Sequence, residues 1–85
     1  MSKIIFSEDA WKEYTSWQDE DKKTLRKIND LLKAVQRNHF DGAEPLKGDK
    51  QGLYSRRINN KDRLVYSIKD DDVIVLQCKG HYDDK

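Results

Sequence analysis

The residues of this chain that could carry out chemistry are a small set of charged side chains in its second half. Glu44 offers a carboxylate that can accept a proton, and His81 offers an imidazole that is partly protonated near neutral pH. Between them the chain places the cationic side chains of Lys47, Arg56, Arg57 and Arg63. A carboxylate, an imidazole and fixed cations are enough to move protons on and off a phosphodiester without a metal ion. Their combination on so small a chain points to an RNA-cleaving enzyme.

Each of these residues also has an ordinary structural interpretation. Glu44 could be a solvated acid in a loop, since Pro45 follows it, and His81 could be a surface histidine. The arginines could be ion-paired with the aspartates at positions 70–72. His39 has no partner in the pattern, so we interpret it as structural. No single residue is therefore diagnostic.

The distribution of charge says more than its total. The formal net charge is only +1, so the chain is not a polycation. Between positions 47 and 63, however, six basic residues stand against two acidic ones, which gives a local net charge of +4. Such a segment can attract a phosphate backbone, although a solvated hairpin face has the same composition.

Composition narrows the class of protein further. The chain has 85 residues, which leaves room for one domain, residues 1–85, with one modest core. The single cysteine, Cys78, excludes an intramolecular disulfide and a zinc cluster, and its apolar neighbours indicate a small buried side chain. We expect no metal ion and no cofactor. There is no signal peptide or membrane-spanning run, so we expect a cytoplasmic protein without a membrane partner.

The first half is predicted to fold as one strand followed by two helices. Residues 3–6 suit a short strand, and Ser7 is a good N-cap for a helix. The apolar residues of this helix recur at helical spacing and include Ala10, Trp11, Tyr14 and Trp17. The acidic run 19–21 can cap a second helix, and Asn38 is predicted to end it in the left-handed conformation. The buried stripe of the second helix is predicted to be Leu25, Ile28, Leu32 and Val35, with Leu31 beside it. Both tryptophans are interpreted as core or groove residues.

The second half is predicted to be a three-stranded antiparallel meander. Residues 39–52 are irregular, and beyond them the hydrophobic pattern has a period of two over 53–58, 63–68 and 73–79. Because the turns between these strands are short, neighbouring strands must be antiparallel. The last strand is apolar on both faces, which predicts an internal position. The result is an α+β fold of order β-α-α-β-β-β, with two N-terminal helices on a mainly antiparallel sheet.

Alternation along the strands assigns side chains to faces. Leu64, Tyr66 and Ile68 share the predicted core face, so Arg63 should point to the opposite, open side. Arg56 and Arg57 are adjacent and cannot both point there in a regular strand. Spacing alone leaves open which of the two does.

Four segments in order resemble the YoeB/Txe toxins, members of the RelE/ParE superfamily of bacterial toxin–antitoxin systems. They are residues 44–47 (EPLK), 52–58 (GLYSRRI), 62–66 (DRLVY) and the pair His81-Tyr82. The resemblance extends from Ile4 to Tyr82. It implies a small microbial-ribonuclease-like domain, a RelE-like fold, which agrees with the element order given above.

The resemblance also implies a role for each candidate residue. Glu44 would be the general base and His81 the general acid, while Tyr82 would shape the site or assist the leaving group. The implied phosphate and transition-state binders are Lys47, Arg57 and Arg63. The same matching favours Arg57 over Arg56 as the inward-facing arginine, and Arg56 is kept as a further RNA-binding candidate.

The activity that the resemblance implies is ribosome-dependent cleavage of mRNA in the A site. A base removes the proton of the 2′-hydroxyl, an acid protonates the departing 5′-oxygen, and cations stabilise the charge that develops on the phosphorus oxygens. The implied partners are the ribosome, mRNA and a cognate YefM/Axe-like antitoxin with a disordered acidic C-terminal segment. Operator DNA would be bound only through the antitoxin complex, and a homodimer is possible.

Two departures and two alternative functions accompany this interpretation. The chain continues beyond Tyr82 with the tail 83–85, which carries two aspartates, and Gly80 stands where a larger residue is expected. A ParE-like toxin that inhibits DNA gyrase would lack the pair formed by Glu44 and His81. A catalytically inactive module could use the same basic segment to bind RNA or an acidic peptide.

Overall fold

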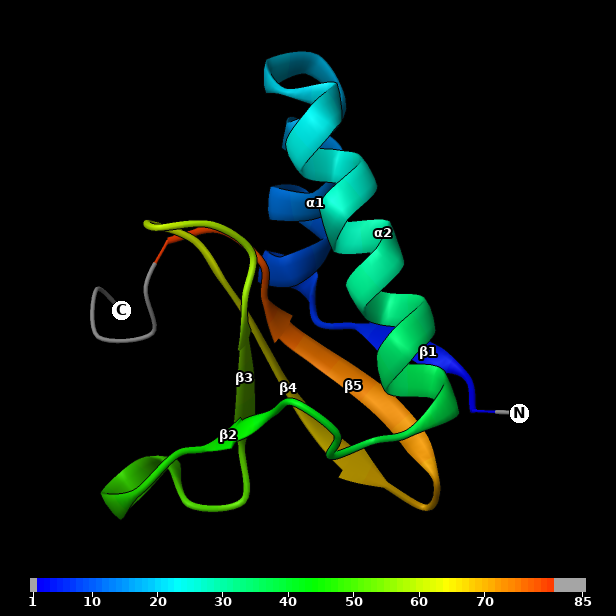
Figure 1. Ribbon diagram of the computed structural model, residues 1–85, viewed down its shortest axis with the longest axis vertical. Coiled ribbons are helices and arrows are strands. Elements are labelled where there is room, and N and C mark those ends of the chain that lie inside the picture. Colours follow the sequence, from blue (N-terminus) through cyan, green and yellow to red (C-terminus); the bar gives the residue numbers. More distant parts are fainter. Residues whose placement is uncertain (1, 81–85) are drawn as a thin grey trace.

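Five strands form one sheet, and two helices pack together on one of its faces (Figure 1). The computed structural model describes residues 2–80. Its elements are β1 (Ile4–Phe6), α1 (Glu8–Glu20), α2 (Lys22–Arg37), β2 (Glu44–Pro45), β3 (Tyr54–Arg57), β4 (Arg63–Lys69) and β5 (Asp72–Gln77), with a short 3-10 turn at Gly48–Lys50. The strand order is β1-β5-β4-β3-β2, in which β1 runs parallel to β5 and the other neighbours are antiparallel. The predicted α+β order is confirmed, with one additional short strand, β2.

Both helices begin at the predicted caps. The Ser7 hydroxyl accepts a hydrogen bond from the Ala10 N–H at 3.1 Å, and the Asp21 carboxylate accepts from Lys23 and Thr24 N–H groups at the start of α2. The predicted left-handed end at Asn38 is wrong, because Asn38 is extended with φ −147°. Its N–H still donates to a helical carbonyl, and its side chain accepts from the Phe40 N–H, so the helix end needs no left-handed residue.

The core lies between the helices and the strands that they cover. The predicted stripe of α2 is confirmed: Ile28, Leu31, Leu32 and Val35 are buried, and Leu25 packs against them. On the sheet they meet Leu64, Tyr66, Val73 and Val75, so the predicted core face of β4 is also correct. Trp17 is buried, whereas Trp11 is 52% exposed and lies against the rings of Phe6 and Tyr14 outside the core. None of the helices in residues 2–80 has the length and apolar character needed to cross a membrane.

The three predicted strands of the second half are present as β3, β4 and β5, and β5 is internal, between β1 and β4. A two-residue turn with Asp70 and Asp71 at positive φ connects β4 to β5. The region 39–52 is not wholly irregular, because Glu44–Pro45 pairs with β3. A strand of two residues has no visible period, and Pro45 is tolerated there because β2 is the edge of the sheet.

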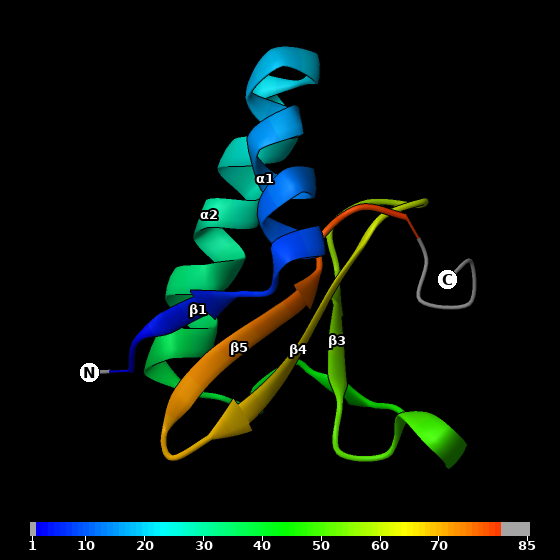
Figure 2. The same ribbon diagram turned by 180° about the vertical axis from the view of Figure 1, so that it is seen from behind.

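The sheet extends beyond the helices. Both helices contact β5, and the two views show them standing over β1 and β5 while β3 and β2 project to the side (Figures 1 and 2). The predicted functional residues of β2 and β3 therefore lie on the part of the sheet that is least covered by helix.

Candidate active site

The register of the sheet brings three of the predicted residues to one face. Glu44 lies opposite Ser55 in the β2–β3 pair, and Arg57 lies opposite Arg63 in the β3–β4 pair. Directly opposed residues share a face, and so do residues two apart in one strand. The side chains of Glu44, Arg57 and Arg63 therefore all turn away from the core face of β4.

We call this side of β2–β4 the open face and define it by Glu44, Ser55, Arg57, Arg63 and Val65. Ser55 and Val65 are short, buried side chains at its floor, whereas Glu44 and Arg57 are exposed. Glu44 and Arg57 are diagonal neighbours on adjacent strands, a relation that typically separates Cα atoms by about 7–8 Å. Long side chains at that spacing can reach one bound group from two sides.

The cations of the open face have no salt-bridge partner among residues 2–80. Within residues 2–80, Glu44, Arg57 and Arg63 take part in no salt bridge, so the alternative of ion pairs with aspartates 70–72 is wrong. Asp71 instead lies near His39, and Asp72 accepts from the Lys3 N–H. Those aspartates are at the far end of β4 from Arg63, so they cannot reach the open-face arginines.

The environment of Arg63 favours an anionic ligand. Its side chain is partly buried, and its Nε is fully buried without an acceptor among the described residues. A buried donor without a partner costs roughly 1–3 kcal/mol. Arg57 lies directly across the ladder, and like charges in that relation also destabilise a sheet. A phosphate between the two guanidinium groups would relieve the repulsion between them.

Arg56 and Lys47 are placed differently. Arg56 alternates with Arg57 and lies on the opposite face, where its guanidinium covers the backbone of Gly42: a Cβ added there would be 3.2 Å from Nη2. Spacing alone left open whether Arg56 or Arg57 points to the open side, and the register shows that Arg57 does. Lys47 follows the end of β2 and precedes the 3-10 turn, so the sheet register does not assign its exposed side chain to a face.

His81 and Tyr82 lie outside the described residues, as does the tail 83–85. The last described residue, Gly80, is hydrogen-bonded beside the open face: its carbonyl accepts from the Arg63 N–H at 3.0 Å. Its N–H donates to the Asp62 carboxylate at 2.7 Å, and Gln77 donates to its carbonyl at 3.0 Å. The chain thus proceeds to His81 from a point next to the strand residue Arg63.

Sequence reasoning missed Asp62 and Gln77. Both are polar residues that the fold buries, Asp62 to 5% and Gln77 to 6% exposure. A signal for Gln77 was present, since it is a polar residue in an otherwise apolar strand. Asp62 had no such signal, because an aspartate in a turn is ordinary. Its importance is visible only in the structure, where its carboxylate accepts from the N–H of Gly80, 18 positions away in the sequence.

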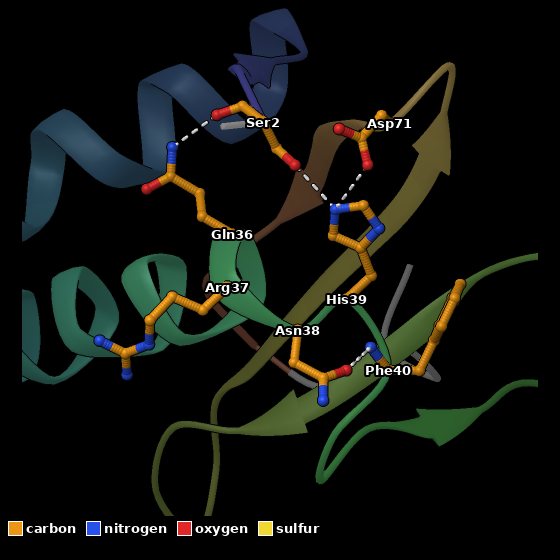
Figure 3. A pocket seen from close by; sticks show the side chains of 7 residues that line it. All are labelled: Ser2, Gln36, Arg37, Asn38, His39, Phe40 and Asp71. Atoms are coloured by element: carbon orange, nitrogen blue, oxygen red, sulfur yellow. Dashed lines mark hydrogen bonds and ion pairs between the residues drawn. The ribbon is translucent and has the colours of Figure 1, made fainter.

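A second polar cluster formed by Ser2, His39 and Asp71 lines a pocket at the other end of the sheet (Figure 3). Ser2 Oγ is 2.7 Å and Asp71 Oδ1 is 3.5 Å from the same ring nitrogen, Nε2 of His39. His39 therefore has partners that the sequence pattern did not predict, and its structural interpretation fits them. A catalytic triad needs the hydroxyl and the carboxylate on different ring nitrogens, which this cluster lacks.

Cys78 behaves as the sequence predicts. It is fully buried, its thiol donates to the Ala10 carbonyl at 3.7 Å, and burial raises the pKa of Cys78 to about 12. A thiol in that environment stays protonated and is no nucleophile. Among residues 2–80, no cluster of three His, Cys, Asp or Glu side chains is arranged to hold a metal ion.

Comparison with known proteins finds relatives along nearly the whole chain. The model of the family described as the YoeB-like toxin of bacterial type II toxin–antitoxin systems matches residues 6–82. Toxin YoeB of Synechocystis is 48% identical over 83 residues, which cover 94% of this chain and 96% of that protein.

Solved structures show the same similarity in three dimensions. The YoeB/ParE toxin from Agrobacterium tumefaciens superimposes with a TM-score of 0.91 at 39% identity, over 94% of this chain and 99% of that one. A chain of the heterotetrameric YoeB-YefM toxin-antitoxin complex from Staphylococcus aureus superimposes with a TM-score of 0.87 at 43% identity, over 96% and 99% of the two chains. The expected RelE-like fold is confirmed by these superpositions.

Proposed function

This chain belongs to the YoeB-like toxins of bacterial type II toxin–antitoxin systems, and from that premise we propose that it is a metal-independent endoribonuclease that cleaves mRNA in the ribosomal A site. The observation that supports this most is the register of β2, β3 and β4. It gathers one carboxylate and two unneutralised guanidinium groups on the open face, at the point where the chain proceeds to His81. The proposal assigns the protein to the cytoplasm, where ribosomes translate.

In the proposed reaction, Glu44 removes the proton of a ribose 2′-hydroxyl. The oxygen attacks the adjacent phosphorus, and the bond to the 5′-oxygen of the next nucleotide breaks. Arg57 and Arg63 stabilise the negative charge that develops on the phosphorus oxygens, because they lie side by side on the open face and neither forms a salt bridge within residues 2–80. The products are a 2′,3′-cyclic phosphate and a 5′-hydroxyl.

The remaining roles complete the proton balance. His81 protonates the departing 5′-oxygen, and Tyr82 shapes the site or assists that step. Lys47 binds a neighbouring phosphate, which its exposed position at the end of β2 allows. Arg56 is on the other face of β3, so the proposal gives it no part in cleavage.

The experiment that tests this function adds purified protein to a bacterial translation extract with a defined transcript and maps the new 5′ ends. We expect cuts in frame with the A-site codon, which disappear in Glu44→Gln and in His81→Ala. Asp49→Asn is a matched control, because it removes an exposed charge from the same loop region. Intact transcripts together with blocked gyrase supercoiling would contradict the proposal in favour of the gyrase-inhibiting alternative.

The proposed partner is an antitoxin of the YefM type. The S. aureus relative forms a heterotetrameric toxin-antitoxin complex, and this chain matches a chain of that complex over 96% of its length. An acidic antitoxin segment would find uncompensated cations on the open face. Operator DNA would be bound through the antitoxin. Arg57→Glu should weaken co-purification with the antitoxin, and unchanged co-purification would place the antitoxin elsewhere.

Self-association is a separate part of the proposal. We propose a homodimer, for which the described residues offer an exposed aromatic side chain, Trp11, beside the edge strand β1. The mass of the purified protein in solution, measured at micromolar concentration, distinguishes one chain from two.

A further inference from the structure

Asp62 is a buried carboxylate with an unusual set of partners. Its Oδ1 accepts from the Gly80 N–H at 2.7 Å, and its Oδ2 accepts from the Asn59 side chain at 2.9 Å. Among residues 2–80 no cation pairs with it. Burying a charge without a counter-ion is costly, so the hydrogen bonds of this group must offset that cost.

The turn that contains Asp62 does not need the Oδ1 contact. Asn59 closes this turn, since its Oδ1 accepts from the N–H groups of Lys61 and Asp62 at 2.8 Å. The Asp62 carbonyl accepts from the N–H groups of Ile58 and Asn59. The Oδ1 of Asp62 is thereby left to act on a residue 18 positions away, Gly80.

Gly80 is held from three sides. Besides the bond from its N–H to Asp62, its carbonyl accepts from the Arg63 N–H and from the Gln77 side chain, both at 3.0 Å. Its φ is +81°, a left-handed conformation that disfavours residues with a Cβ. This conformation gives a physical reason for the glycine that departs from the family pattern.

The residues just before Gly80 are held by side chains of helix α1. The Trp17 indole donates to the Cys78 carbonyl at 2.9 Å, and the Cys78 N–H donates to the Glu13 carboxylate at 2.8 Å. The Lys79 ammonium binds Glu20 at 2.6 Å. These contacts hold 78 and 79 against α1, whereas the contacts of Gly80 are with the sheet, beside Arg63.

We infer that Asp62, assisted by Gln77, is a positioning residue for the general acid. It fixes the backbone of Gly80 beside Arg63, and so fixes the residue that directly precedes His81. This inference rests on the proposed function, in which His81 protonates the leaving group. A general acid displaced by about 1 Å can lose roughly 10²-fold in rate, although substrate binding is unaffected.

The test compares Asp62→Ala with Asp62→Asn in cleavage of mRNA on programmed bacterial ribosomes. Asp62→Ala removes the acceptor of the Gly80 N–H, so we expect kcat to fall about 10- to 100-fold with KM changed less than about twofold. Asp62→Asn keeps one oxygen that can accept from the Gly80 N–H but turns its NH2 group toward the Asn59 donor, so it should restore only part of kcat. The alkaline limb of the kcat–pH profile reports loss of the protonated acid. It should flatten in Asp62→Ala, because the rate no longer depends on the protonation state of an imidazole that is out of position.

Two further variants keep the outcome interpretable. Gln77→Leu removes only the side-chain donor to Gly80 and Lys79, so it tests the same site if Asp62→Ala fails to fold, and we expect a smaller fall in kcat. Asp49→Asn, at an exposed position, should leave kcat unchanged. If kcat and its pH profile stay at the parent values in folded Asp62→Ala and folded Gln77→Leu while Glu44→Gln abolishes cleavage, the positioning role is wrong and the nuclease function stands. If the parent protein does not cleave, the proposed function itself has failed.

Discussion

Two polar clusters at opposite ends of β4 differ in whether their side chains find partners within the fold. Near the end at Lys69, the side chains of Ser2 and Asp71 both contact the His39 ring, and Tyr66 donates to the His39 carbonyl. At the beginning of β4, Arg63 shares the open face with Glu44 and Arg57, and none of the three finds a charged partner among residues 2–80. Charged groups that satisfy one another stabilise a fold, whereas groups that the fold leaves unpaired are available to a ligand.

The cluster around His39 joins three parts of the chain. The N-terminal residue Ser2 is held by its hydroxyl on His39 and by its carbonyl, which accepts from Gln36 of α2 at 2.7 Å. Tyr66 donates its hydroxyl to the His39 carbonyl. The contrast with the open face yields four predictions, which follow in order of expected effect.

The largest effect is expected at Glu44. Glu44→Gln keeps the shape of the side chain and removes the base, so cleavage of A-site mRNA should fall by roughly 10²–10⁴-fold. Quantitative mapping of 5′ ends on a defined transcript measures this. Asp49→Asn should cleave normally, and an equal loss in both variants would show that general charge, rather than the base, is responsible.

The two adjacent arginines form the sharpest matched pair. Arg57→Ala should lower cleavage by roughly 10²-fold because it removes a fixed donor to the phosphate. Arg56→Ala should stay within about twofold of the parent in cleavage, since that side chain lies against Gly42 on the other face. Rates are compared after thermal melts show both variants folded. A larger loss in Arg56→Ala would overturn the assignment of faces.

A third prediction concerns His39. His39→Ala should leave cleavage within about twofold while it lowers the free energy of unfolding by roughly 1–2 kcal/mol, because Ser2 and Asp71 lose their contacts with the imidazole ring. Chemical denaturation and the transcript assay measure the two effects. Loss of cleavage without loss of stability would make this cluster functional.

The smallest effect lies away from both clusters, at the N-cap of α2. The hydrogen bond from the Thr24 side chain is the main cause that lowers the pKa of Asp21 below its ordinary value of 3.8. A group with a lowered folded pKa stabilises the fold above the ordinary value, and that contribution is lost as the pH falls through the lowered value. The stability difference between the parent and Asp21→Asn should therefore shrink on acidification below pH 3.8. A difference that grows there would contradict the sign.

Much of the fold follows from local signals in the sequence. Ser7 and Asp21 cap the helices as their side-chain chemistry predicts, and the period-two segments become β3, β4 and β5. The strand β2 was not predictable, because two residues that include Pro45 carry no period. Trp11 is 52% exposed, because helical spacing does not show which residues at the margin of an apolar stripe face solvent.

The candidate site also has a part that the sequence predicted and a part that it did not. Residue types selected Glu44, Arg56, Arg57 and Arg63 as candidates, and the family resemblance favoured Arg57 over Arg56. The register of β2 to β4 shows that Glu44, Arg57 and Arg63 share a face and that Arg56 does not. The positions of Asp62 and Gln77 beside Gly80 depend on contacts across the fold, which local patterns do not contain. The assignments of His81 and Tyr82 concern residues outside the described range and remain predictions.

The most direct test of the central claim is a single 2′-deoxy substitution in the A-site codon of the mRNA, followed by analysis of the cleavage ends. The account predicts that the deoxy linkage stays intact, and that the unmodified transcript yields a 2′,3′-cyclic phosphate and a 5′-hydroxyl. Cleavage at the deoxy position would contradict it, because the nucleophile from which Glu44 is proposed to take a proton would be absent.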